Sequence, residues 1–263
     1  MRTDEIDRQS SRRVGRCLSV CFAAAALVAI AACAVTTPAP ETQAPQEPPP
    51  RAWSADALGQ LRAVAESTPL HGLGAETQAI AELDRLDAAS RHDAGAATAL
   101  DLTADAVFRR LALVFSSGAV APASADPSWT IPGAPAPDVE ALLNAARAEG
   151  HVATALTALL PSSAEYAALE SELAKVGAEP AGTSDASGLT REDRLERLRA
   201  NLERWRWLPR TLPARRIDVL VPFFEARLVG FGSVGNRRVI VGVQRMPTPT
   251  FQAEIESITL NPS

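Results

Sequence analysis

Three histidines are the first candidates for metal binding or acid–base chemistry, because imidazole titrates near neutral pH and ligates transition metals. They are His71, His92 and His151, and the intervals between them are far longer than those of a zinc site. We interpret each as a single surface or cap residue and expect no metal site. Ser233 is the nearest match to a nucleophile elbow, but Phe231 stands where that motif needs its first glycine.

Gly230, Gly232 and Gly235 spell the G-x-G-x-x-G pattern of dinucleotide-binding loops. Such a loop binds pyrophosphate only when its glycines open a helix. The residues that follow, 237–241, read as a β-strand, so we expect no bound cofactor. We interpret carboxylates on the helices, such as Glu170, as parts of solvated faces rather than as an acid–base pair. The sequence therefore offers no catalytic residue of these kinds.

All three cysteines, Cys17, Cys21 and Cys33, lie near the N-terminus. The rest of the chain therefore has no thiol nucleophile and no disulfide. Arginines precede an uncharged run over residues 17–35, which is typical of a secretion signal. Residues 30–33 read Ile-Ala-Ala-Cys and resemble a bacterial lipobox, which implies that Cys33 is acylated and anchors the mature protein. The same run is long enough to span a bilayer as an uncleaved signal anchor, so both anchors stay open.

Changes in composition divide the remaining chain into segments. A proline-rich stretch predicts an extended tether, and leucines at spacings of three and four predict helices. A Gly, Ala and Ser stretch predicts a linker, and alternating apolar residues near the C-terminus predict strands. The boundaries are 1–33 for the signal segment, 34–52 for the tether, 53–176 for an all-α domain, 177–189 for the linker, 190–216 for an Arg/Trp-rich connecting helix and 217–263 for the strand region.

Capping residues and glycines predict where the helices begin and end. Helices are expected from Trp53 to Pro69, around 80–86, from Thr103 to Gly118, from Asp138 to Gly150, from Val152 to Pro161, from a Ser162–Glu165 capping box to Gly177, and from a Thr190–Asp193 cap to Leu208. Strands are expected at 217–221, 225–229, 239–243 and over Ile255, Ile258 and Leu260. They predict part of a mixed or antiparallel sheet.

The formal net charge of −5 argues against a nucleic-acid partner, because phosphate binding needs clustered positive charge. The stretch from Arg191 to Arg216 is locally basic, with nine arginines against four carboxylates. We expect its arginines to be solvated and ion-paired. The packed side should be an apolar stripe of Leu195, Leu198, Leu202 and Trp205.

Residues 201–209 read N-L-E-R-W-R-W-L-P, which resembles the signature of large murein L,D-transpeptidases with a helical scaffold domain. Residues 221–224, 238–242, 248–251 and 260–262 resemble, in order, the start of that family's catalytic domain. Weaker similarities to its scaffold domain lie at 71–73, 102–103, Phe108, Gly118, Trp129, 142–143, 160–161 and Tyr166. The resemblance implies an α+β fold, in which an all-α scaffold domain is followed by an incomplete β-rich L,D-transpeptidase catalytic domain.

In this family a cysteine thiolate in an S-H-G-C motif attacks a tetrapeptide stem of peptidoglycan, and the acyl-enzyme passes to a second stem as a 3-3 cross-link. This sequence contains no S-H-G-C motif, so no catalytic residue carries over. It also shows no peptidoglycan-binding module, and Val243 replaces a polar residue of the family. The resemblance implies peptidoglycan stem peptides or cell-wall enzymes as partners, no cofactor, and a membrane-anchored place in the bacterial periplasm. Ala34 follows the acylated cysteine and, by resemblance to other such lipoproteins, permits transfer of the protein to the outer membrane.

Two functions of different classes remain open. The chain is the front part of an L,D-transpeptidase, a transferase that is inactive as given. Alternatively, it is a non-catalytic envelope lipoprotein that keeps the scaffold domain as a binding module. An unfinished sheet exposes strand edges, which natural proteins normally protect, and this favours the first interpretation.

Overall fold

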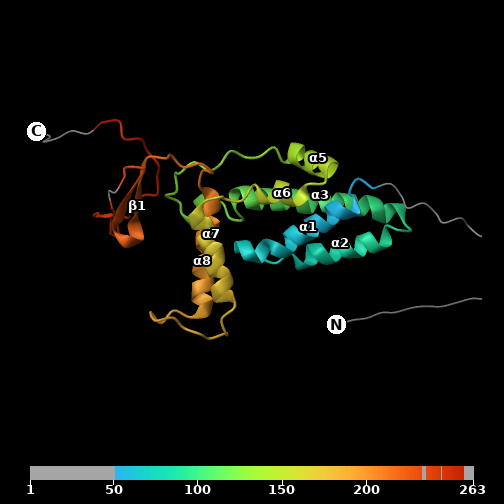
Figure 1. Cartoon of the computed structure of the whole chain (residues 1–263), viewed down its shortest axis with the longest axis horizontal. Helices are drawn as coiled ribbons and strands as arrows, with labels where there is room; N and C mark the ends of the chain where they lie inside the picture. The colour runs from blue at the N-terminus through green and yellow to red at the C-terminus, as the bar shows by residue number, and fades with distance from the viewer. Residues whose placement is uncertain (1–50, 233–234, 244, 258–263) are drawn as a thin grey trace, which may run out of the picture. The chain divides into compact units, whose positions relative to one another are not determined.

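A computed structural model describes residues 51–232, 235–243 and 245–257 (Figure 1). Cys33 and the rest of the signal segment, nearly all of the tether, Ser233, Ile258 and Leu260 lie outside the described residues. The helices are α1 Ala55–Ser67, η1 Thr68–His71, α2 Thr77–Ala89, α3 Ala94–Ser117, α4 Pro122–Ala125, α5 Val139–Glu149, α6 Val152–Thr157, α7 Ala164–Gly177, α8 Arg191–Trp207 and η2 Val221–Phe223. The strands are β1 Arg216–Leu220, β2 Glu225–Val229 and β3 Arg237–Arg238. Helices with a small antiparallel sheet make an α+β fold, as expected.

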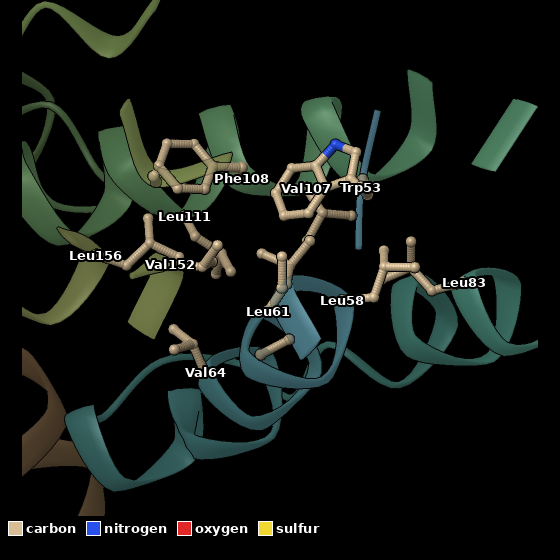
Figure 2. Close-up of a cluster of buried hydrophobic side chains, with 14 of the residues drawn as sticks. Trp53, Leu58, Leu61, Val64, Leu83, Val107, Phe108, Leu111, Val152 and Leu156 are labelled. Carbon is tan, nitrogen blue, oxygen red and sulfur yellow. The ribbon is translucent and has the colours of Figure 1, made fainter. Parts of the chain in front are cut away.

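The main helical core lies between α1, α2, α3, α5 and α6. Figure 2 shows Leu61 and Val64 of α1 facing α3, with Leu156 of α6 beside them. Trp53 is buried in this core, with its ring 6.3 Å from that of Phe108. Burial of these leucines and aromatic rings is the main source of stability for such a core.

A second apolar cluster lies between α7 and α8, which run side by side as a hairpin (Figure 1). Its buried members are Tyr166, Leu173, Val176, Leu195 and Leu202. We call this cluster the hairpin core. Leu195 and Leu202 confirm the apolar stripe predicted for α8, while Trp205 at its end is only half-buried.

Several predicted helix ends are confirmed by cap geometry. The Asp138 side chain accepts a hydrogen bond from the Ala141 amide at 3.0 Å, and Gly150 ends α5 in the left-handed conformation. Thr190 and Asp193 form the predicted capping box of α8.

Two predicted helix starts are wrong. The helix expected to begin at Thr103 already begins at Ala94, because the Asp93 side chain caps the Gly95 amide at 2.7 Å and an alanine-rich turn follows. The cap of α7 is Ser163 rather than Ser162, and its hydroxyl accepts from the Tyr166 amide at 3.1 Å.

The sheet is a three-stranded antiparallel meander in the order β1-β2-β3. The strand predicted at 239–243 is wrong, because pairing covers only Arg237 and Arg238 and ends after the Val239 amide donates to the Phe224 carbonyl at 2.9 Å. Ile240 is fully exposed, so it has no neighbour to pack on. Residues 255–257, expected to begin another strand, have no strand structure.

Candidate functional site

Arg206, near the end of α8, is the one charged residue that is buried among the described residues. Its side chain is fully buried. One terminal nitrogen donates to the His71 carbonyl at 2.9 Å and to the Tyr166 hydroxyl at 3.0 Å, and the other donates to the Glu203 carboxylate at 2.6 Å. We call these four residues, His71, Tyr166, Glu203 and Arg206, the joint.

This burial corrects the prediction that the arginines of α8 are solvated. Arg206 follows Leu202 by one helical turn, so it points toward the hairpin core. Glu203, one turn before Arg206 on the same helix, supplies the counter-charge that a buried guanidinium requires. Arg197 and Arg199, by contrast, are exposed as predicted.

The carboxylate of Glu203 also ties α8 to the chain after α3. Its second oxygen accepts from the Val120 amide at 2.8 Å. Gly118 lies nearby with φ of +89°, and a methyl group added there would meet Trp207 Nε1 at 2.8 Å. Because the backbone passes this close to Trp207 with a positive φ, only glycine fits at position 118. The buried Trp207 ring meets the Trp129 ring edge-to-face at 5.2 Å.

Arg210, which follows α8, ties the chain to the end of α3. Its guanidinium donates to the carbonyls of Phe115 at 3.0 Å and Ser116 at 2.5 Å, the last turn of α3. Carbonyls at a helix C-terminus carry partial negative charge, so a cation is favourable there. Burial lowers the pKa of Arg210, but an arginine stays charged at physiological pH.

His71 is not a lone surface residue, which corrects the sequence prediction. Its Nδ1 lies 2.5 Å from Glu170 Oε1, and its ring meets the Phe115 ring edge-to-face at 5.4 Å. The prediction holds for His92, which is exposed, and for His151, an exposed residue at the N-cap of α6. The Glu170 side chain is only 28% exposed, so it does not lie on the solvated face that the sequence predicts.

The Tyr166 hydroxyl accepts one of the hydrogen bonds of the joint. Burial raises the pKa of its hydroxyl, although the charge of Arg206 acts in the opposite direction. The phenol therefore stays neutral and serves as a hydrogen-bond partner. A groove of about 230 Å³ lies beside this region and is lined by Trp205, Arg210 and Arg216, among others.

The joint has the chemistry of a fixed connection rather than that of a reactive centre. Its charges are paired and buried, and it contains no nucleophile with an adjacent base. Across the part of the chain that the structure describes, no three histidine, cysteine or acidic residues gather as metal ligands. Of the glycine pattern at 230–235, the described part leads into β3 rather than a helix. The described helices also include none with the length and apolar character needed to cross a bilayer.

Comparison with known protein families finds a match in the helical part of the chain. Residues 50–173 match the model described as "Scaffold domain", the scaffold domain of L,D-transpeptidases. No curated protein and no solved structure matches the chain. Two residues within the matched stretch, His71 and Tyr166, bind the Arg206 side chain that follows it.

Proposed function

We propose that this chain is an L,D-transpeptidase-family protein of the bacterial cell wall, in which the scaffold domain and α8 together position the front part of a catalytic domain. The family forms 3-3 cross-links between peptidoglycan stem peptides. The strand region from residue 217 onward corresponds to that front part, on the resemblance of its short motifs.

The observation that carries the proposal is the composition of the joint. Arg206 and Glu203 come from the 201–209 signature, whereas His71 and Tyr166 come from the stretch that matches the scaffold model. Gly118 and Trp129, which also resemble scaffold-domain positions, pack against Trp207 or approach it closely. Several of the residues that carry the resemblance thus come together in one place. This supports a role in holding α8, and β1 after it, in a fixed orientation.

A second candidate is a non-catalytic envelope lipoprotein whose scaffold domain binds cell-wall enzymes. It is favoured by the absence of any cysteine from residues 34–263, since the family reaction needs a thiolate. In both cases we propose a periplasmic location, with a membrane anchor at Cys33 or through an uncleaved signal segment. Fractionation of a Cys33→Ser protein separates the two anchors, because only the signal anchor would keep it in the membrane.

Two measurements test the proposed function. The full chain should sediment with purified peptidoglycan sacculi, and failure of a folded sample to do so would contradict a role at the cell wall. Residues 34–263, incubated with a carbapenem that mimics the stem substrate, should keep their intact mass. One stoichiometric adduct would overturn the absence of a nucleophile, because positioning accelerates a reaction only when the reacting group is present.

A further inference from the structure

Residues 249–257 follow the sheet without helix or strand structure. Among the described residues, the hydrogen bonds that they make to other segments all go to the loop between α4 and α5. The Thr130 amide donates to the Thr250 carbonyl at 2.9 Å, and the Thr130 hydroxyl donates to the same carbonyl at 3.1 Å. The Thr250 hydroxyl donates to the Asp126 carboxylate at 3.1 Å. Three hydrogen bonds therefore join this loop to a segment that lies 120 or more positions later in the chain.

Contacts inside the loop prepare Asp126 to accept this bond. Its other carboxylate oxygen accepts from the Ser128 amide at 2.9 Å and from the Ser128 hydroxyl at 2.6 Å. The Trp129 amide donates to the Asp126 carbonyl at 3.0 Å, which closes a turn. The hydrogen bonds from Ser128 lower the pKa of the Asp126 carboxyl, so it is ionised at neutral pH. The loop therefore presents a fixed acceptor, and little further ordering is needed to hold Thr250.

The same loop contacts the end of α8. The Trp129 ring meets the buried Trp207 ring edge-to-face at 5.2 Å. A methyl group added at Gly133 would lie 3.4 Å from the Trp207 carbonyl oxygen, so the backbone passes close to this helix end. The loop thus connects the point where the chain leaves α8 toward β1 with Thr250, which follows the sheet.

We propose that residues 126–131 form a clasp that attaches the chain after the sheet to the helical part, so that the strand region is held at both of its ends. The first end is held through α8 and the joint. With that attachment alone, the sheet could turn about residues 208–215, which have no helix or strand structure. A second attachment at Thr250 removes this freedom. The clasp is a property of the fold and does not depend on the proposed function.

Amide hydrogen exchange of the full chain, measured by NMR, tests the clasp. The Thr130 amide reports on it directly, because Thr130 lies in an irregular loop and its amide donates to Thr250. Thr250→Val keeps the shape and the carbonyl of this residue but removes the hydroxyl that donates to Asp126. Protection of the Thr130 amide should fall about fivefold, the effect of one hydrogen bond, while α3 amides keep theirs. Unchanged protection of Thr130, or an equal fall in α3, would overturn the proposal.

Two further variants assign the response to the bond between Thr250 and Asp126. Thr248→Val is the matched control, because the Thr248 hydroxyl accepts from the Gly242 amide at 2.7 Å within the strand region. It should leave the Thr130 amide protected, and a fall as large as that in Thr250→Val would refute the clasp. In an Asp126→Ala background, Thr250→Val should cause no further fall, since the acceptor is already absent. A second fivefold fall there would contradict the proposed bond.

Residual dipolar couplings test whether the clasp holds the sheet. In the unaltered chain, couplings from β1, β2 and α3 should fit one common alignment. In the double variant Asp126→Ala/Thr250→Val, couplings from the two strands should shrink relative to those from α3, because the sheet can then turn. A sheet that keeps the common alignment in the double variant would show that α8 alone fixes it, and the clasp would be rejected.

Discussion

Replacement of Arg206 by leucine removes the group that connects α8 to two other parts of the scaffold. The substitution deletes three hydrogen bonds, to the His71 carbonyl, the Tyr166 hydroxyl and the Glu203 carboxylate. Breaking a buried ion pair on one side typically costs about 3 to 5 kcal/mol, because the remaining charge is left without a partner. Glu203 is still 13% exposed and keeps the Val120 amide, so we expect the lower end, about 3 kcal/mol.

Urea unfolding followed by circular dichroism measures this loss. A cost of about 3 kcal/mol should lower the midpoint by about 1 to 1.5 M urea for a domain of this size. Arg197→Leu is the matched control, because Arg197 is exposed on the same helix, and it should change the free energy of unfolding by less than about 0.5 kcal/mol. A loss below about 1 kcal/mol for Arg206→Leu would show that the joint contributes little, and the reasoning would be refuted.

Three further changes probe the same region and the main core. Trp207→Ala should cost about 3 to 5 kcal/mol of unfolding free energy because the ring is buried, whereas the half-buried Trp205→Ala should cost about 1 to 2. Gly118→Ala should lower the melting temperature more than Gly150→Ala. Both glycines have positive φ, but only Gly118 faces neighbouring side chains, those of Glu203 and Trp207. An equal fall in melting temperature would contradict this close approach. Burial raises the pKa of the Asp87 carboxyl, but hydrogen bonds from Arg51 and Arg62 lower it more, so the net pKa is below its usual value. The stability that Asp87 contributes to the fold is therefore present above about pH 4 and is lost as pH falls further. Asp87→Asn should therefore flatten the acid limb of stability measured against pH.

Local signals in the sequence predicted the helices well because caps act over three or four residues. Asp138, Gly150 and the Thr190–Asp193 box each work through a contact within one turn, which spacing alone can indicate. The errors at Ser163 and Asp93 have the same origin. Two adjacent serines precede α7, and an aspartate before an alanine run can cap as well as a threonine can, so local chemistry allowed either choice.

The joint could not be predicted from local patterns. Arg206 and His71 are 135 positions apart in the chain, and Arg206 and Tyr166 are 40 apart. Helical periodicity gave the apolar stripe of α8 but classed its arginines as solvated, because a charge is normally placed on the outer face. The one available signal was the resemblance, whose weak matches included His71, Gly118 and Tyr166. Those positions are brought together only by tertiary packing.

The use of arginine at position 206 follows from the directions of its acceptors. A carbonyl from η1, a hydroxyl from α7 and a carboxylate from α8 surround one planar group, and a guanidinium can donate to all three at once. A lysine is a point charge on a flexible stem, and a leucine would fill the volume without fixing a direction. Apolar packing could hold α8 near the scaffold, but it would tolerate rotation and sliding of the helix. The two directional bonds to η1 and α7 set the angle of α8, and through it the start of β1, while the Glu203 carboxylate on the same helix balances the charge. A fixed angle is the property that a positioning domain needs.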